Sequence, residues 1–318
     1  MRALVHAGGG ALELRDVADP APGPGEAVVA VAGCGICGSD MHAVLGHDPR
    51  RPPPIVLGHE VAGRVGGRRV AVNPLVACGA CAACRAGRDN LCPAREILSL
   101  PPRPGGFAEA VAVPEANLVD VPDGVSDAAA SLAEPMAVSW HAVRLGLAAL
   151  HPSMDGPALV IGGGAIGATA ALVLADRGRP AVVVEPNAAR RAVLAARMGL
   201  DARADAPGDH PLVIDAVGLA ATRVAASAAV RPGGAIVHLG LAEDAGGVDV
   251  RRLTLQEVAL LGAYTYTARD FRDCCAAMWA GRLGPLDWTE TRPLADGARA
   301  FADLRAGRVA APKLVLAP

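Results

Sequence analysis

Three residues in two separate stretches of the sequence have the types that hold a metal ion. Cys37 lies in the run Gly-Cys-Gly-Ile-Cys-Gly-Ser-Asp-Met-His, and His59 and Glu60 follow a proline-rich turn. A thiolate, an imidazole and a carboxylate can bind Zn²⁺ and leave one coordination position open, as a catalytic zinc site requires. The alternative is a buried cysteine beside a hydrogen-bonded core histidine. The spacing predicts a catalytic zinc site.

Two polar residues follow Cys37 closely. Ser39 and His42 come two and five residues after it. A hydroxyl there can take the proton from a substrate alcohol, and an imidazole can pass that proton to water. The alternative is that Ser39 caps a helix and that His42 is merely exposed. Because a buried alcohol needs such a path when it loses its proton, these two residues are candidates for a proton relay.

Four cysteines lie within fifteen residues: Cys78, Cys81, Cys84 and Cys92. Four thiolates saturate a tetrahedral Zn²⁺ and leave no open position, so this site is expected to hold a lobe together and to do no chemistry. A zinc ribbon that binds nucleic acid is the alternative, but its cysteine pairs would lie further apart among basic residues. We predict a structural zinc site.

Glu134 has apolar neighbours in the run Ser-Leu-Ala-Glu-Pro-Met-Ala-Val. Apolar residues recur at helical spacing from Ser126 to Leu145, and Pro135 is expected to break that helix and place the carboxylate at a bend. Glu134 could be a surface charge. Its apolar setting favours a buried carboxylate that has a partner.

A glycine-rich turn indicates a nucleotide site. The apolar run Ala158–Ile161 leads into Gly162-Gly-Gly-Ala-Ile-Gly167 and then into an Ala/Leu-rich helix that ends near Arg177. Gly162, Gly164 and Gly167 fit G-x-G-x-x-G at a strand-to-helix junction, where the backbone around Ala165 and Ile166 can approach a pyrophosphate at the helix N-terminus.

The next predicted strand, Ala181–Val184, ends in Glu185, at the position where an acid accepts hydrogen bonds from the adenosine ribose. That acid would repel a 2′-phosphate, so NAD is preferred to NADP. Arg190 lies one turn into the following helix, and it could stack on the adenine or help to hold a phosphate.

Length and composition limit the number of domains and the class of protein. The chain has 318 residues, enough for about two domains, with 52% hydrophobic and only 3% aromatic residues. Its net charge of -2 and the lack of a long basic run argue against nucleic-acid binding. No apolar segment reaches the ~18 residues of a membrane span. We expect a cytoplasmic protein whose clustered cysteines bind metal rather than form disulfides.

The pattern of elements predicts two domains. Residues 1–32 read as short, mostly antiparallel strands, whereas strands and helices alternate from residue 156 and predict a parallel sheet of about six strands. Residues 268–279 read as a helix with Cys274 and Cys275 in the core, and residues 289–318 as short strands. We predict a zinc domain of residues 1–140, to which 268–318 return, and a dinucleotide-binding domain of residues 141–267.

With these motifs in this order, the chain resembles the zinc-dependent medium-chain alcohol dehydrogenases nearly end to end. It is most similar to the polyol, vicinal-diol and L-idonate 5-dehydrogenase branch in four runs: Gly35-Ile-Cys-Gly-Ser-Asp40, Gly58-His-Glu60, Ala71-Val-Asn-Pro74 and Ala133-Glu-Pro135. The resemblance implies a Rossmann-type doubly wound parallel sheet plus a mostly β, GroES-like catalytic domain.

In that branch the residues matching Cys37, His59 and Glu60 hold the zinc, and the one matching Glu134 lies beside it. The family's proton relay corresponds to Ser39, the nicotinamide ribose and His42. Zn²⁺ with one thiolate and one carboxylate is already neutral, and a third anion would weaken it as a Lewis acid. We therefore expect Glu134 to act through water or to exchange with Glu60.

The chain departs from the family pattern in two places, and the second bears on the substrate. The stretch between Glu60 and Asn73 is shorter than usual. Thr265 stands where polyol dehydrogenases tend to have an arginine that holds substrate hydroxyls, which weakens the case for a long sugar alcohol. Tyr264 and Tyr266, the only tyrosines, either line the pocket or belong to the core.

We predict an enzyme with one catalytic and one structural zinc that oxidises a secondary alcohol, within a polyol, diol or sugar acid, to a ketone with NAD. The alternatives are an amino-alcohol or cyclitol dehydrogenase and an NAD-binding protein without turnover. The resemblance implies a homodimer or homotetramer, pairing through the edge strand at 258–262. Neither a nucleic acid nor a membrane is expected as a partner.

Overall fold

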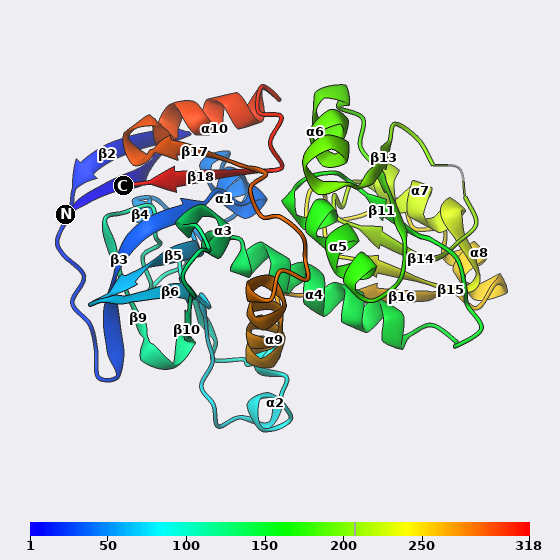
Figure 1. Ribbon diagram of the computed structural model, residues 1–318, viewed down its shortest axis with the longest axis horizontal. Helices are drawn as coiled ribbons and strands as arrows, with labels where there is room; N and C mark the ends of the chain where they lie inside the picture. The colour runs from blue at the N-terminus through cyan, green and yellow to red at the C-terminus, as the bar shows by residue number, and fades with distance from the viewer. Residues whose placement is uncertain (207) are drawn as a thin grey trace. The chain divides into compact units, whose positions relative to one another are not determined.

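The computed structural model describes residues 1–206 and 208–318, which form two compact units (Figure 1). Unit 1 comprises Met1–Glu134, Thr267–Ala280 and Thr289–Pro318, and unit 2 comprises Pro135–Tyr266 and Gly281–Trp288. The sequence-based division assigned residues 135–140 and 281–288 to the zinc domain, whereas both segments group with unit 2. Within the described residues, no helix has the length and apolar character needed to cross a membrane.

Unit 1 is built mainly from short antiparallel strands. They are β1 (Arg2–Gly8), β2 (Ala11–Asp16), β3 (Glu26–Gly35), β4 (Ile55–Val56), β5 (Glu60–Val65), β6 (Arg68–Val72), β7 (Leu75–Val76), β8 (Glu96–Ile97), β9 (Ala110–Pro114), β10 (Leu118–Asp120), β17 (Thr289–Pro293) and β18 (Lys313–Ala317).

The central sheet of unit 1 runs in the order β10-β6-β5-β3-β18-β17, with β9 also paired to β3. Strand β3 is therefore a central strand of the sheet, and it pairs antiparallel with β5, β9 and β18. Strand β18 brings the C-terminal end of the chain beside Cys34 and Gly35. This pairing places residues more than two hundred positions apart beside the loop that carries the predicted zinc ligand Cys37.

The helices of unit 1 are short. They are α1 (Gly38–Val44), α2 (Ala82–Arg85), α3 (Asp127–Ser131), α9 (Ala268–Trp279) and α10 (Gly297–Arg305), with single 3₁₀ turns η1 (Asp89–Leu91), η2 (Glu115–Asn117) and η3 (Leu294–Asp296). The helix expected at 268–279 is confirmed, and Cys274 and Cys275 are buried. Helix α10 corrects the expectation of strands alone over 289–318. Its Ala300 and Phe301 are buried in the core of unit 1, where Phe301 packs edge-on against Phe107.

The helical segment expected at 126–145 is divided earlier than predicted. Helix α3 ends at Ser131, and α4 (Ala133–Ala148) begins after Leu132. Pro135 lies in the first turn of α4, where a missing N–H costs no intrahelical hydrogen bond, so it starts a helix here rather than breaking one. Glu134 therefore lies in a helical first turn and not at a bend.

Unit 2 is a parallel sheet with helices packed on it. Its strands are β11 (Ala158–Ile161), β12 (Ala181–Val184), β13 (Asp201–Arg203), β14 (His210–Asp215), β15 (Val230–His238) and β16 (Ala259–Gly262). Its helices are α4 from Pro135 onward, α5 (Ala165–Asp176), α6 (Ala188–Met198), α7 (Ala220–Ala229) and α8 (Val250–Leu255).

Among the described residues the sheet has six strands in the order β13-β12-β11-β14-β15-β16. All of the pairings are parallel, and the order reverses at β11. This is the doubly wound arrangement in which ligands bind at the carboxyl ends of the strands, next to the reversal point. The predicted fold class is confirmed.

Candidate metal centre and cofactor site

Strand pairing brings Cys37, His59 and Glu60 together. Cys37 caps α1 just after β3, and Glu60 begins β5 directly opposite Gly35 of β3. The donor atoms of the three side chains all lie within 4.8 Å of one another. A side chain at position 35 would collide with Glu60 Oε2, so only glycine leaves room for this carboxylate. The three side chains form one compact donor set.

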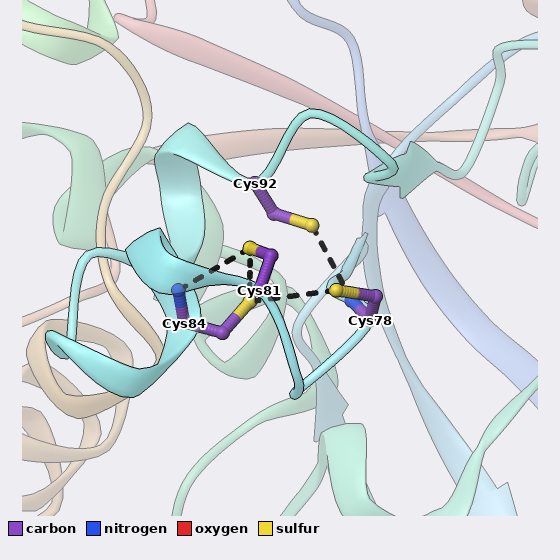
Figure 2. A group of neighbouring side chains, drawn as sticks. All are labelled: Cys78, Cys81, Cys84 and Cys92. Atoms are coloured by element: carbon purple, nitrogen blue, oxygen red, sulfur yellow. Dashed lines mark hydrogen bonds between the residues drawn. The ribbon is translucent and has the colours of Figure 1, made fainter.

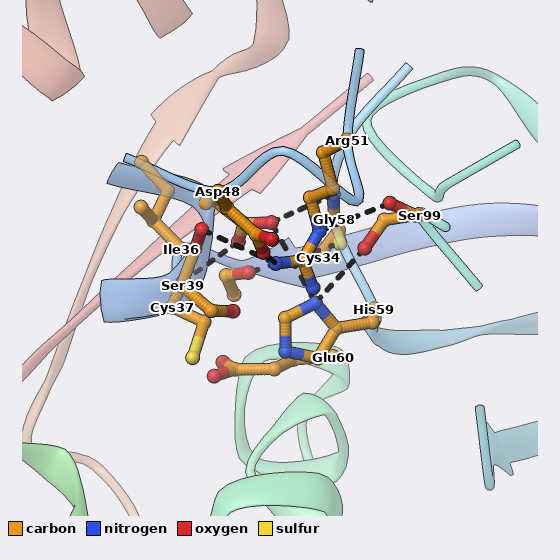
Figure 3. Close-up of polar contacts among 12 residues, drawn as sticks. Cys34, Ile36, Cys37, Ser39, Asp48, Arg51, Gly58, His59, Glu60 and Ser99 are labelled. Carbon is orange, nitrogen blue, oxygen red and sulfur yellow. Dashed lines mark hydrogen bonds and ion pairs between the residues drawn. The ribbon is translucent and has the colours of Figure 1, made fainter. Parts of the chain in front are cut away.

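His59 is held at its Nδ1 atom by two polar residues. Ser99 Oγ lies 3.3 Å from Nδ1 (Figure 3). Asp40 Oδ1 lies 3.6 Å from the same atom. Asp40 also accepts hydrogen bonds from the backbone N–H groups of Cys37 and Gly58, at 3.0 and 3.2 Å. Burial opposes a charged imidazole, but Asp40 and Cys37 raise the pKa of His59 well above its ordinary value. A metal ion that binds this imidazole must therefore displace a proton.

Glu60 has a partner that the sequence analysis missed. Lys313 Nζ donates to Glu60 Oε1 at 2.5 Å and to the Ile36 carbonyl at 2.9 Å. Both charged side chains are almost completely buried, with 4% and 1% of the side-chain surface exposed. The other carboxylate oxygen, Oε2, is buried and has no hydrogen-bond partner among the described residues. An oxygen in that state fits a metal ligand.

One feature of the sequence could have drawn attention to Lys313. It is the only lysine in the chain, whereas every other basic residue apart from the histidines is arginine. Burial alone would lower the pKa of Lys313, but the charges of Glu60, Cys37 and Glu134 raise it above its ordinary value. This lysine is therefore a fixed positive charge beside the donor set.

The three predicted catalytic residues all lie in unit 1. Ser39 and His42 are half-buried and lie three residues apart on α1, a spacing that places side chains on one face of a helix. The imidazole of His42 lies edge-on to that of His47, with ring centres 6.0 Å apart. Glu134 is buried, and its charge acts on Lys313.

The four cysteines of the predicted structural site also come together. Figure 2 shows Cys78, Cys81, Cys84 and Cys92 turned toward a common centre, and their sulfur atoms all lie within 4.8 Å of one another. Backbone N–H groups of Ala80 and Cys81 lower the pKa of Cys78 to about 6. Because a metal binds the thiolate, this shift prepares the lobe for an ion.

The segment that carries the four cysteines, residues 78–92, here called the four-cysteine lobe, is hydrogen-bonded to helix α9. Asp89, between the last two cysteines, accepts a hydrogen bond at 2.9 Å from the backbone N–H of Ala268, the first residue of α9. A carboxylate at a helix N-terminus satisfies an orphan donor and interacts favourably with the helix dipole. The lobe thus stabilises the start of α9.

The glycine-rich turn lies where β11 passes into α5. Gly162 has φ of 101°, and Gly164 caps α5, whose first residues are Ala165 and Ile166. A side chain at Gly167 would collide with the carbonyl oxygen of Gly162, whereas the space beside Gly164 is open. Close helix–strand packing and an open helix N-terminus fit a bound pyrophosphate.

Glu185 follows β12 and is buried next to this turn. Its Oε2 accepts from the backbone N–H of Gly163 at 3.0 Å, and its Oε1 accepts from that of Asn187 at 2.8 Å. Arg190 Nη1 lies 3.6 Å from Oε2, at ion-pair distance. The carboxylate therefore fixes the glycine turn and presents a negative charge where an adenosine ribose would lie.

Thr265 has an unusual backbone. Its φ is 46°, a left-handed conformation that is rare for a β-branched residue, and its Oγ1 is buried without a partner among the described residues. Tyr266 is fully buried and belongs to the core, whereas Tyr264 is half-buried. A strained backbone with an unsatisfied hydroxyl marks Thr265 as a candidate ligand contact.

Comparison with known proteins gives one family. Residues 23–123 match the alcohol dehydrogenase GroES-like domain. The chain is 34% identical over 288 residues to L-galactonate-5-dehydrogenase of Escherichia coli, covering 83% of each chain. It is 30% identical over 319 residues to 2-dehydro-3-deoxy-L-galactonate 5-dehydrogenase of Pseudoalteromonas atlantica, covering 89% of each.

Among solved structures, the chain is similar to acetophenone reductase of Geotrichum candidum in complex with NAD. The TM-score is 0.89 at 28% identity, and the likeness covers 100% of this chain and 97% of the other.

Proposed function

The chain belongs to the zinc-dependent medium-chain alcohol dehydrogenase family, and from this we propose that it oxidises a secondary hydroxyl of a sugar acid to a ketone, with NAD as hydride acceptor. The main support is that the donor atoms of Cys37, His59 and Glu60 lie within 4.8 Å of one another. In addition, Glu60 Oε2 is buried and has no hydrogen-bond partner among the described residues. Two relatives named for oxidation at position 5 of sugar acids support this substrate class.

Cys37, His59 and Glu60 would hold the catalytic zinc, because one sulfur, one nitrogen and one carboxylate oxygen form a donor set that zinc accepts. Zinc bound there would act as a Lewis acid and lower the pKa of a substrate hydroxyl. The Asp40 carboxylate fixes both ligand loops, since its two oxygens accept from Cys37 and Gly58. Cys78, Cys81, Cys84 and Cys92 would hold a second, structural zinc.

The charge on Lys313 changes the electrostatic balance of the centre. Zn²⁺ with the Cys37 thiolate and the Glu60 carboxylate sums to zero, and the buried Lys313 ammonium adds one positive charge. This charge leaves room for the Glu134 carboxylate without making the centre negative. We place Glu134 beside the zinc, either acting through water or exchanging with Glu60.

Ser39 and His42 would carry the proton away. The Ser39 hydroxyl would accept the proton that the substrate loses as it releases its own proton, and His42 would deliver a proton toward water. Their spacing on α1 and the half-exposure of His42 support this order.

We assign NAD to the turn at Gly162, Gly164 and Gly167, with the adenosine ribose at Glu185. The buried carboxylate of Glu185 disfavours a 2′-phosphate. Arg190 lies at ion-pair distance from that carboxylate, so its own positive charge is partly engaged and is less free to bind a phosphate. NAD is therefore preferred to NADP.

A homodimer or homotetramer that pairs along β16 completes the proposal. This strand is an edge of the parallel sheet among the described residues, and Leu260 on it is 45% exposed. Leu255 and Val250 of the preceding α8 are 71% and 67% exposed. An uncovered edge with apolar side chains favours association with a second copy. Light scattering of Leu260→Lys beside the unaltered protein tests this pairing.

The experiment that tests the function is NADH formation by zinc-replete protein. The panel contains L-galactonate, L-idonate, sugar alcohols, 2,3-butanediol, L-threonine and cyclitols, each with NAD and with NADP. The proposal predicts turnover of a sugar acid with NAD and loss of that turnover in Cys37→Ser. Turnover of L-threonine or a cyclitol in place of every sugar acid would contradict the substrate class.

A further inference from the structure

Ser99 has a backbone conformation that its residue type disfavours. It is completely buried, and its φ of 68° lies in the left-handed region, where a Cβ approaches the backbone too closely. Such a conformation persists only when its surroundings fix it, and in proteins it concentrates at functional sites. Ser99 was not among the residues that the sequence pointed to.

In this conformation the hydroxyl and the carbonyl oxygen of Ser99 each contact a buried side chain. Its Oγ lies 3.3 Å from His59 Nδ1, and its carbonyl oxygen accepts a hydrogen bond from Arg51 Nε at 3.0 Å. Figure 3 shows the imidazole of His59 with Ser99 on one side and with Cys37 and Glu60 on the other. Ser99 thus holds the side of the ring that faces away from the donor set.

Arg51 holds the backbone of Ser99 through the hydrogen bond to its carbonyl oxygen. Only 4% of Arg51 is exposed, and its charge is balanced by Asp48, whose Oδ2 lies 2.6 Å from Arg51 Nη1. The same Nη1 atom lies 3.4 Å from the carbonyl oxygen of Ser39. One guanidinium therefore connects the backbone of the proposed relay residue with the backbone of the residue that contacts His59.

Asp40 does not make Ser99 redundant. The carboxylate oxygens of Asp40 already accept from the backbone N–H groups of Cys37 and Gly58, at 3.0 and 3.2 Å. Asp40 Oδ1 lies 3.6 Å from His59 Nδ1, which is longer than the 3.3 Å to Ser99 Oγ. Asp40 supplies charge and joins the two loops, while Ser99 Oγ makes the shorter of the two contacts to His59 Nδ1.

We propose that Ser99, held in its left-handed conformation by Arg51, is a positioning residue for His59 and aims the second ring nitrogen at Cys37 and Glu60. This inference rests on the proposed zinc site. Groups that contact a metal-binding histidine at its other nitrogen fix the orientation of the ring, and their loss typically costs about 10–100-fold in metal affinity or activity. Arg51 extends the same support to Ser39.

Two substitutions separate the hydrogen bond from the strain. Ser99→Ala removes the hydroxyl and keeps a Cβ in the left-handed region, whereas Ser99→Gly removes the hydroxyl and relieves the strain. Ser131→Ala is the matched control, because Ser131 is buried in unit 1 and donates to the Ala128 carbonyl at 2.8 Å, remote in sequence from the donor set.

Three quantities are measured: the thermal unfolding midpoint of the metal-depleted protein, zinc affinity by chelator competition, and the absorption spectrum of cobalt(II) bound at Cys37, His59 and Glu60. The inference predicts that Ser99→Gly unfolds at a temperature equal to or above that of Ser99→Ala. Both variants should nevertheless bind zinc about tenfold or more weakly at this site and show a shifted cobalt spectrum, and Ser131→Ala should show neither change.

Unaltered zinc affinity and cobalt spectra in both Ser99 variants would overturn the inference, since a purely structural role changes only the unfolding midpoint. The proposed function fails in a different way: the unaltered protein would then bind no zinc or cobalt at Cys37, His59 and Glu60.

Discussion

Lys313 Nζ lies 2.5 Å from Glu60 Oε1, and the two residues are separated by 253 positions in the sequence. The contact exists because β18 pairs with β3 and β3 pairs with β5, so that the C-terminal strand delivers an ammonium group to the first residue of β5. A buried cation here neutralises one carboxylate oxygen and leaves the other for a metal. The contact joins the last strand of the fold to the chemistry of the site.

Lys313→Met should destabilise the metal-depleted protein by about 3–5 kcal/mol, because it leaves the Glu60 carboxylate buried without its partner. Urea unfolding followed by circular dichroism measures the change. The matched control is Arg203→Met, which breaks an ion pair with Asp201 whose side chains are 56% and 48% exposed. Exposed pairs contribute little. Equal stability of Lys313→Met and the control would contradict a buried, energetically important pair.

The ammonium group of Lys313 should stay protonated above pH 10.5, because Glu60 and Cys37 raise its pKa from that ordinary value despite the opposing effect of burial. A raised pKa stabilises the fold fully below 10.5, and this contribution disappears as the pH rises through the folded-state value. As the only lysine, it gives a single side-chain NMR signal after ¹⁵N-lysine labelling. A titration midpoint below 10.5 would refute the prediction.

Glu134→Gln should lower NADH formation by about 10–100-fold while the catalytic zinc remains bound. The carboxylate is buried near Lys313, and an amide keeps its shape but removes its charge. Zinc content and turnover are measured on the same samples. Complete loss of the catalytic metal would show that Glu134 is a permanent ligand and not one that acts through water.

Cys92→Ser should loosen the four-cysteine lobe. With one thiolate missing, the proposed zinc site would be incomplete, and the anchor from Asp89 to the N-terminus of α9 should weaken with it. Trypsin should then cleave after Arg85 or Arg88 faster than in the unaltered protein, while NAD binding by unit 2 persists. Asp89→Asn, which keeps all four cysteines, is the control. An unchanged cleavage rate in Cys92→Ser would argue against a structural metal.

Glu185→Gln should weaken NAD binding by about tenfold or more, because hydrogen bonds to a charged group contribute about 1.5–3 kcal/mol. The same change removes the charge that organises the Gly163 backbone, so NADP should gain little. Isothermal titration with both cofactors measures the effect. A variant that prefers NADP would show that repulsion by Glu185 alone sets cofactor choice.

The parallel sheet could be predicted because its signals are local. The runs Ala158–Ile161 and Ala181–Val184 are short, apolar and bounded by turn residues, and the structure confirms both strands. Helix α10 was missed because its apolar residues include small alanines that read weakly as a helical stripe. Pro135 was misjudged because proline breaks a helix interior but suits a first turn.

The polar support of the candidate site was harder to predict. Arg51 contacts Ser99 across 48 residues, and Ser99 contacts His59 across 40. Such contacts depend on strand register and on a left-handed backbone, and neither is encoded by a local motif. Lys313 is the exception, because a single lysine among many arginines is a visible feature of the sequence. The predicted ligands and relay residues themselves stay predictions.

The measurement that tests the central claim most directly is anomalous X-ray diffraction at the zinc absorption edge, on crystals of zinc-replete protein. The account predicts two zinc peaks per chain, one bounded by Cys37 Sγ, His59 and Glu60 Oε2 and the other by the four cysteine sulfurs. A peak at the four cysteines alone, in protein that turns over its substrate, would contradict the claim that Cys37, His59 and Glu60 form the catalytic zinc site.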